Sequence, residues 1–166
     1  MQQARTPAFE NRTRTDLIVV HCSATRASMD IGVREITQWH VQRGFDTVGY
    51  HYVIRRDGQL ESGRPEGVIG AHVRGHNARS IGICLAGGVD NQNQPENNFS
   101  AAQLQTLEVL LHDVTTRYPH ARVLGHRDLS PDLNGDGVIS SNEFIKACPS
   151  FDVGLWHRSC QTAMTT

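Results

Sequence analysis

The chain has 166 residues and a formal net charge of −1, with 20% charged and 38% hydrophobic residues. This length suits one domain, and the composition is that of an ordinary folded protein, which excludes low-complexity and strongly disordered chains. The balanced charge excludes the global basic field that nucleic-acid binding usually needs. No apolar run approaches the ~18 residues of a membrane span. We therefore expect one domain that binds no nucleic acid and has no transmembrane segment, and we expect a monomer.

The N-terminal residues 1–14 are polar and rich in arginine, and we expect them to form a loosely packed arm before a domain at 15–166. Residues 1–8 have no apolar core between a basic start and a cleavage site, so they do not resemble a signal peptide. The chain is therefore expected to be made in the cytoplasm.

A strand and a helix are predicted first along the chain. Residues 17–21 are apolar and β-branched, which predicts a buried strand. Asp30 is expected to cap a helix over residues 33–43, and Gly44 is expected to end it.

A hairpin and a second buried strand follow. Residues 50–56 and 59–61 flank an Asp-Gly dipeptide, which is a strong hairpin signal. Tyr50 and His51 alternate along the first of these runs, so they should face opposite ways, with His51 packed in the core. Residues 80–85 form another apolar run and predict the next strand.

The longest predicted helix lies in the second half of the chain. Ser100 and Gln103 form a capping box that opens a helix over residues 101–118. The expected apolar face of this helix consists of Leu104, Leu107, Leu111, Val114 and Tyr118.

A short strand and a short helix complete the predicted elements. Residues 122–125 predict the strand, and residues 153–158 predict the helix, with Ser150 or Asp152 as its cap and Trp156 packed inward. Strands alternate with helices, but the hairpin interrupts a purely parallel pattern. The fold class expected is therefore α/β, with a mixed central β-sheet flanked by α-helices.

Three potential metal ligands lie where a predicted element gives way to a loop. His21 and His126 each end a predicted strand, and Cys148 follows later in the chain. Two imidazoles and one thiolate suit Zn²⁺, and three protein ligands leave a fourth position open for catalysis. On spacing alone, the alternative is that both histidines are hydrogen-bonded residues at strand ends, because no short ligand motif joins them.

A second possible metal site lies in residues 132–143, which read Asp-Leu-Asn-Gly-Asp-Gly-Val-Ile-Ser-Ser-Asn-Glu and match the twelve-residue EF-hand loop. Pro131 disfavours a helix running into this loop, so we expect a single EF-hand-like Ca²⁺ site with a structural role. The alternative is a polar surface loop with Asp-Gly turns. The predicted calcium ligands are Asp132, Asn134, Asp136, the carbonyl of Val138, and Glu143.

Six motifs in this order resemble a known family, the type 2 N-acetylmuramoyl-L-alanine amidases, which include phage endolysins and the related peptidoglycan recognition proteins. The resemblance spans residues 15–158. It implies a single domain with a peptidoglycan recognition protein-like fold. The motifs lie at residues 20–25, 49–52, 70–72, 77 with 80–84, 125–128 and 146–152.

The resemblance also implies roles for individual residues. His21, His126 and Cys148 match the zinc ligands of the family. Tyr50 matches the tyrosine beside the attacking water, and Lys146 matches the basic residue that faces the scissile carbonyl. Without the resemblance, a half-buried strand tyrosine and a surface lysine would be the preferred interpretations.

His72 matches a family position near the substrate groove, and the alternative for it is an ordinary loop histidine. The resemblance implies zinc-dependent hydrolysis of the amide bond between N-acetylmuramic acid and L-alanine in peptidoglycan. An enzyme of this kind would be made in the bacterial host cytoplasm and act on the cell wall after release. Calcium in the 132–143 loop would then hold the segment that carries Lys146 and Cys148.

Three other functions stay open at this point. One is a peptidoglycan-binding module without activity, although related modules typically replace the zinc cysteine, which is present here. Another is a regulator that binds a second protein. The third is a cysteine hydrolase using Cys148 or Cys22, which would need surroundings that lower the pKa of the thiol.

Overall fold

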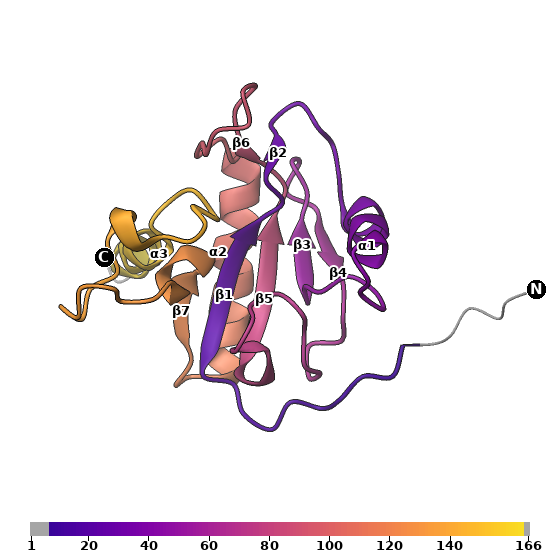
Figure 1. Ribbon diagram of the computed structural model, residues 1–166, viewed down its shortest axis with the longest axis horizontal. Helices are drawn as coiled ribbons and strands as arrows, with labels where there is room; N and C mark the ends of the chain where they lie inside the picture. Colours follow the sequence, from indigo (N-terminus) through magenta and orange to yellow (C-terminus); the bar gives the residue numbers. More distant parts are fainter. Residues whose placement is uncertain (1–6, 165–166) are drawn as a thin grey trace, which may run out of the picture.

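The computed structural model describes residues 7–164, which are built around a five-stranded sheet with strand order β4-β3-β5-β1-β7 (Figure 1). Strand β1 pairs in parallel with β5 and β7, β3 pairs in parallel with β5, and only β4 is antiparallel, to β3. This confirms the predicted mixed sheet. The strands are β1 Leu17–Cys22, β3 Tyr52–Ile54, β4 Leu60–Ser62, β5 Ser80–Leu85 and β7 Arg122–Gly125.

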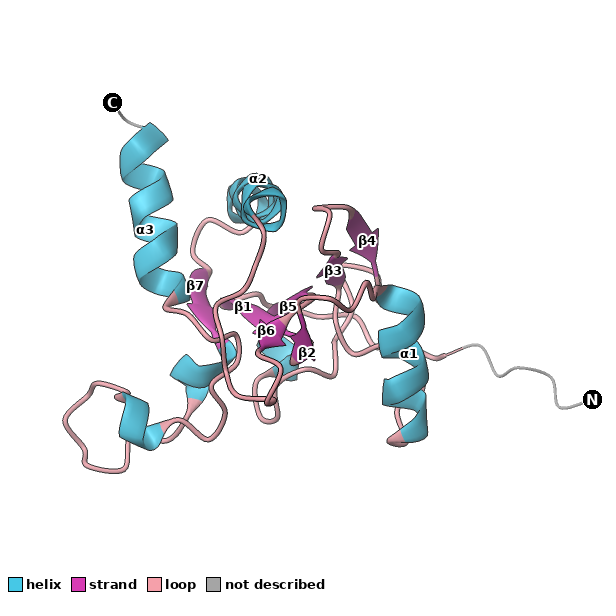
Figure 2. Ribbon diagram, turned by 90° about the horizontal axis from the view of Figure 1, so that it is seen from above, coloured by secondary structure: helices cyan, strands magenta, loops and turns pink. Residues whose placement is uncertain are grey.

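Helices cover both faces of this sheet. Figure 2 shows α2 and α3 on one side and α1 with the short 3₁₀ helices that follow β7 on the other. A second sheet of two strands, β2 Thr25–Arg26 and β6 Gly88–Val89, extends beyond the carboxyl ends of β1 and β5. The helices are α1 Val33–Gln42, α2 Ala101–Arg117 and α3 Val153–Met164, with 3₁₀ helices η1 Asn77–Arg79, η2 His126–Leu129 and η3 Ser141–Glu143.

The alternation of side chains along β1 produces two cores. Ile18 and Val20 are fully buried against α2 and α3, in a cluster that includes Leu107 and Val153. Val19 points to the other face. His21 follows the same alternation as Val19, so it lies on the face that carries α1 rather than on the face that packs against α2.

Helix α2 begins with the predicted capping box. The Ser100 hydroxyl accepts a hydrogen bond from the Gln103 amide at 3.1 Å, and the Gln103 side chain accepts one from the Ser100 amide at 3.0 Å. Gln103 is fully buried and also donates to the carbonyl oxygens of Ile54 and Ala86. The predicted apolar face needs one correction, because Leu110 is buried and Leu104 is only partly buried.

The start of α1 differs from the prediction. Asp30 does not cap the helix but pairs with Arg55 at 3.0 Å. The Glu35 carboxylate instead accepts from the Gly32 amide at 2.9 Å, and Glu61 of the neighbouring strand accepts from the Val33 amide at 3.0 Å. Side chains from the first turn and from β4 therefore satisfy two of the amides at the helix N-terminus.

The start of α3 decides which of the two predicted residues, Ser150 or Asp152, caps the helix. The Asp152 carboxylate accepts from the Leu155 amide at 2.9 Å, so Asp152 rather than Ser150 is the cap. The helix extends to Met164, beyond the predicted end at residue 158. Phe151 contacts Trp156, which packs against the main core as predicted. Within the described residues, no helix has the length and apolar character that crossing a membrane requires.

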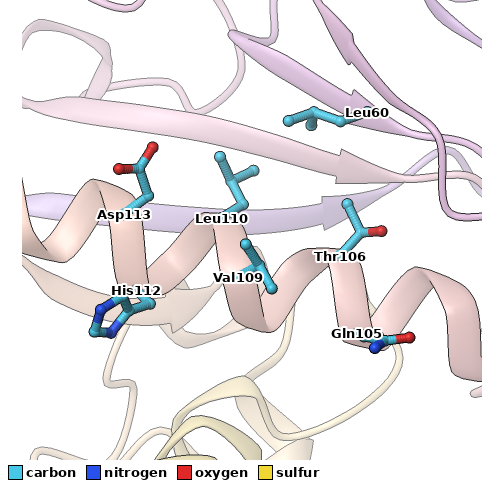
Figure 3. Close-up of a pocket in the computed structure, with 7 residues that line it drawn as sticks. All are labelled: Leu60, Gln105, Thr106, Val109, Leu110, His112 and Asp113. Carbon is cyan, nitrogen blue, oxygen red and sulfur yellow. The ribbon is translucent and has the colours of Figure 1, made fainter.

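The outer side of α2 borders a surface hollow with a volume of about 590 Å³ (Figure 3). Leu60 of β4 and Val109 of α2 are its exposed apolar residues. This hollow lies on the α2 side of the sheet, away from His21, and none of the predicted site residues lines it.

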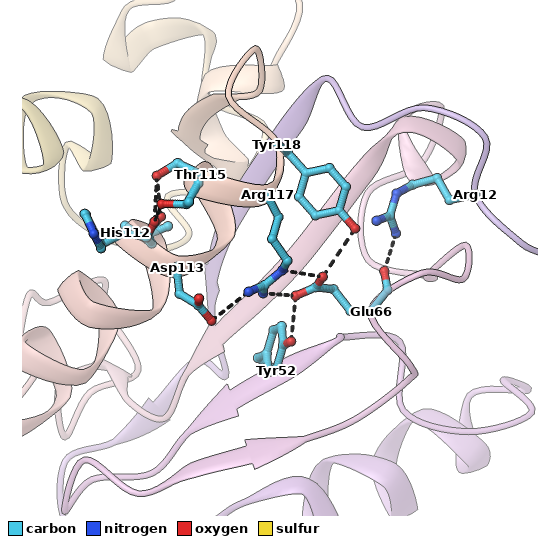
Figure 4. Close-up of polar contacts among 10 residues, drawn as sticks. Arg12, Tyr52, Glu66, His112, Asp113, Thr115, Arg117 and Tyr118 are labelled. Atoms are coloured by element: carbon cyan, nitrogen blue, oxygen red, sulfur yellow. Dashed lines mark hydrogen bonds and ion pairs between the residues drawn. The ribbon is translucent and has the colours of Figure 1, made fainter.

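Part of the predicted N-terminal arm is bound to the domain (Figure 4). The Arg12 guanidinium donates to the carbonyl oxygens of Glu66 and Val68 at 2.7 and 3.0 Å. The Glu66 carboxylate in turn accepts from the Tyr52 hydroxyl at 2.7 Å and from Arg117 of α2. Residues 10–12 are therefore not loosely packed, whereas residues 1–6 of the arm lie outside the described residues.

Candidate metal centre

Strand register brings His21 and His126 together. Val20 pairs with Gly125 in the parallel ladder of β1 and β7; His21 follows Val20 within β1, and His126 follows Gly125 as the first residue of η2. Both side chains therefore emerge at the carboxyl edge of the sheet, with ring centroids 4.7 Å apart. Two histidines separated by 105 positions in the sequence become neighbours because their strands are adjacent and parallel.

Backbone hydrogen bonds place Cys148 beside them. The Cys22 amide, directly after His21, donates to Cys148 Sγ at 3.1 Å. The Arg127 amide, directly after His126, donates to the Cys148 carbonyl at 2.8 Å. Cys148 is therefore held, through its sulfur and its carbonyl oxygen, by the two segments that carry the histidines.

These three side chains form a set that can bind a metal. One potential ligand atom from each of His21, His126 and Cys148 lies within 4.8 Å of the other two. Within residues 7–164, no other group of three or more histidine, cysteine or acidic side chains meets this criterion. Two nitrogens and one sulfur, with His21 itself only 1% exposed, fit a zinc ion that keeps one open position.

The electrostatics of the centre keep the imidazoles neutral. Burial, followed by the neighbouring histidines, lowers the pKa of His21 well below its usual value. Burial and then the positive charge of Lys146 lower the pKa of His126 to about 4. Neutral imidazoles retain the lone pair that a metal needs.

The thiol of Cys148 has the opposite tendency. A hydrogen bond with the Cys22 thiol, followed by burial, raises the pKa of Cys148 well above its usual value. A nucleophilic cysteine needs surroundings that lower this pKa. Without a cation, Cys148 is therefore expected to be a neutral thiol rather than a thiolate nucleophile. It would lose its proton when a cation binds.

Tyr50 and Lys146 both lie close to these ligands. The Tyr50 ring lies 5.0 Å from the ring of His21, just before β3 begins, so neither Tyr50 nor His51 is part of the strand as predicted. Burial raises the pKa of Tyr50, which keeps its hydroxyl protonated. Lys146 is exposed, and its positive charge contributes to lowering the pKa of both His21 and His126, so it lies near these two histidines.

His72, in the loop between β4 and β5, contacts His21 of the candidate ligand set. Its Nδ1 lies 2.8 Å from Nε2 of His21, and its Nε2 lies 3.2 Å from the Ser80 hydroxyl. The sequence did not indicate this contact with His21. Its predicted contact with substrate stays a prediction.

The remaining buried histidines near the site have structural roles. His51 is fully buried, accepts from the Gly82 amide at 2.9 Å and donates to the Val68 carbonyl at 2.8 Å, which confirms it as a core histidine. His40 of α1 accepts from the Gly49 amide at 2.8 Å. This bond ties α1 to the segment that carries Tyr50. A smaller hollow of about 100 Å³ opens here, lined by Ser23, Ile36, Trp39, His40, Arg43 and Tyr50.

The predicted calcium loop is ordered by its own side chains. Asp132 accepts from the amides of Gly135 and Gly137 at 2.9 and 2.8 Å, and Glu143 accepts from the Leu133 amide at 2.8 Å. Its three carboxylates are not gathered as closely as the His21, His126 and Cys148 ligand atoms. An ion would have to draw Glu143 away from the backbone amide of Leu133.

Comparison with known proteins agrees with this arrangement. A family described as N-acetylmuramoyl-L-alanine amidase matches residues 11–142 of the chain. The chain belongs to this family. An endolysin of Klebsiella phage KP32 is 47% identical over 148 residues, covering 89% of each chain. An endolysin of Escherichia phage T7 is 44% identical over 148 residues, which again cover 89% of each chain.

Solved structures show the same fold at lower identity. The N-acetylmuramoyl-L-alanine amidase LysC from Clostridium intestinale URNW has a TM-score of 0.71 at 24% identity, covering 97% of this chain and 91% of that chain. The PGRP-LB protein of Drosophila has a TM-score of 0.64 at 22% identity, covering 93% and 85%. These similarities confirm the predicted fold of amidases and peptidoglycan recognition proteins.

Proposed function

We propose that the chain is a zinc-dependent N-acetylmuramoyl-L-alanine amidase that hydrolyses the amide between N-acetylmuramic acid and L-alanine in peptidoglycan. The observation that carries this proposal is the convergence of His21, His126 and Cys148, whose ligand atoms lie within 4.8 Å of one another. Membership of the amidase family and 47% identity to an endolysin support the same reaction. We further propose that the protein acts on the bacterial cell wall after release from the host, and as a monomer.

The residues around the centre suit hydrolysis of an amide. Zinc held by His21, His126 and Cys148 would polarise the carbonyl and activate water. The ammonium of Lys146 would stabilise the negative charge that develops on the carbonyl oxygen. The protonated hydroxyl of Tyr50 would donate a hydrogen bond within the same site and orient the reacting groups.

The test is digestion of purified peptidoglycan, with the released ends identified by mass spectrometry. We expect free stem peptides that begin with L-alanine, and we expect their loss on zinc chelation and in Cys148→Ala. Cys160→Ala is the matched control, because this partly buried cysteine lies in α3, outside the ligand set, and should leave activity unchanged.

Other outcomes separate the alternatives. Binding to peptidoglycan without cleavage would identify a recognition module. Cleavage that survives chelation but not alkylation of cysteine would identify a cysteine hydrolase, against the raised pKa of Cys148. Cleavage at a sugar or within the stem peptide would refute the proposed bond.

We propose in addition that residues 132–143 bind Ca²⁺ as a structural ion. The support is the match of the loop to the twelve-residue calcium-binding pattern, with Asp132, Asn134, Asp136, Val138 and Glu143 at ligand positions. An ion that binds only the folded state at 100 times its Kd stabilises it by about 2.7 kcal/mol.

The calcium proposal has its own test, in zinc-buffered solution so that the zinc centre is unaffected. We expect Ca²⁺ to raise the Tm of the protein but not that of Glu143→Gln, and to increase activity at temperatures near the Tm. The same small change in Tm for both proteins would mean that the segment is a surface loop without an ion.

A further inference from the structure

A continuous chain of hydrogen bonds leads from the core to the metal ligand His21. The Ser80 hydroxyl, at the start of β5, lies 2.8 Å from the carbonyl oxygen of His76 and 3.2 Å from Nε2 of His72. Nδ1 of His72 lies 2.8 Å from Nε2 of His21. Ser80 has no exposed surface, so water does not compete for its hydroxyl.

The chemistry of these groups fixes the direction of every bond. A carbonyl oxygen only accepts, so the single hydroxyl proton of Ser80 is donated to His76. The Ser80 oxygen must then accept from the Nε2–H of His72. A neutral imidazole has only one N–H, so Nδ1 of His72 accepts, and the donor to it is the Nε2–H of His21. The free lone pair of His21 is therefore on Nδ1.

We propose that His72 is a positioning residue, oriented by Ser80, that holds His21 with Nδ1 directed to the metal. This inference rests on the proposed zinc centre, because His21 must be a ligand for its tautomer to matter. Ligating histidines commonly donate their second ring N–H to a partner that fixes tautomer and ring orientation. Here that partner is a second histidine rather than a carboxylate.

The ring of His72 is itself held in place from several directions. A Cβ atom on Gly82 would lie 2.5 Å from Cγ of His72, and one on Gly70 would lie 2.8 Å from its Cδ2, so the ring occupies space that only glycine leaves open. The Asn77 side chain accepts from the backbone amides of His72 and Val73, both at 2.9 Å. Backbone and ring are thus both constrained.

This arrangement also bears on the interpretation of His72 as a substrate-binding residue. Both ring nitrogens already have partners within the protein, His21 on one side and Ser80 on the other. No ring N–H remains to donate to a substrate. The role that the contacts support is therefore one exerted through His21.

The test compares two substitutions of His72. In His72→Phe the ring is retained and the acceptor is lost. In His72→Asn the side-chain oxygen occupies a position similar to Nδ1 and can still accept from His21. The exposed His112 of α2 provides the control His112→Phe. Zinc affinity is measured by competition with a chromogenic chelator, and the His21 tautomer is measured from its ring ¹⁵N shifts by NMR.

We expect His72→Phe to weaken zinc binding about 10–100-fold, the usual effect of losing such a partner. We also expect this variant to lose the single Nε2–H tautomer of His21. His72→Asn should restore most of the affinity and the tautomer, which a purely structural role of the ring would not predict. His112→Phe should match the wild type.

Two results would have different meanings. Unchanged zinc affinity and an unchanged His21 tautomer in His72→Phe would overturn this inference and leave the amidase proposal intact. Failure of the wild-type protein to bind zinc at all would instead refute the proposed metal centre on which the inference rests.

Discussion

Gly82→Ala should weaken the proposed zinc binding, although Gly82 is not itself one of the proposed ligands. The added Cβ would lie 2.5 Å from Cγ of His72, where an ordinary contact begins near 3.4 Å. Gly82 is in the middle of β5, paired with Val19 of β1, so the strand cannot move away. The His72 ring must therefore shift by about 0.9 Å, which is enough to distort a 2.8 Å hydrogen bond to His21 beyond normal geometry.

The backbone itself tolerates this change. Gly82 does not have the positive φ that disfavours side chains, and alanine is preferred over glycine in a strand by roughly 0.5–1 kcal/mol. Overpacking of a core typically costs about 1–3 kcal/mol, so we expect a folded protein with a modestly lower Tm. Zinc affinity should fall about 10–100-fold, because the displaced ring of His72 would no longer hold His21 in position.

The assay is competition for zinc with a chromogenic chelator, together with thermal unfolding in excess zinc. Gly67→Ala is the matched control, because Gly67 is exposed and a Cβ there meets no atom within 4 Å. Gly82→Ala with wild-type zinc affinity would refute the reasoning, since it would show that the His72 ring can move without effect on the metal. Equal losses in both variants would point to a non-specific effect.

Three further predictions concern stability. Leu111→Ala should lower the free energy of unfolding by about 2–5 kcal/mol, because Leu111 is fully buried in the main core, and urea denaturation will measure it. Glu66→Ala should cost about 1–3 kcal/mol through the lost acceptor of Tyr52 and Arg117, while exposed Glu96→Ala should have little effect in the same assay. Burial lowers the pKa of His51 from 6.5 to about 4, so as the pH falls the unfolded state binds a proton before the folded state does. The contribution of His51 to the free energy of unfolding should therefore be constant above pH 6.5. It should fall by up to about 3 kcal/mol as the pH drops from 6.5 to 4. His51→Gln should show a smaller decrease over this pH range, and an equal decrease would mean that another group is responsible.

The sequence predicted those parts of the site that depend on regular elements. The two strands that lead to His21 and His126 were predicted from their apolar residues, whereas the proximity of the two histidines was implied only by the family resemblance; the parallel register of Val20 with Gly125 supplies its physical cause. The capping box of Ser100 and Gln103 was also predictable, because both halves of the signal lie within four residues. Such features are local, or they follow from the geometry of parallel strands.

Contacts made by loops could not be predicted in this way. The segment that carries His72 has no periodic pattern, so nothing in the sequence indicated that its ring would contact His21. The cap of α1 was missed for a related reason, because Glu61 reaches the helix from β4, a neighbour only in three dimensions. Gln103 appeared to be only a capping residue, since its bonds to Ile54 and Ala86 depend on how α2 packs on the sheet.

The path of the chain between Arg127 and Cys148 has a consequence for how this protein can change. The amide of Arg127 bonds to the carbonyl of Cys148, and the amide of Ile145 bonds to the Ser130 hydroxyl, so the intervening segment leaves and returns at nearly the same point. Each doubling of such a loop costs only about 0.6 kcal/mol in closure entropy. A change in the length of the part between Ser130 and Ile145 should therefore cost little closure entropy, because Lys146 and Cys148 follow the contact that closes the loop and keep their places.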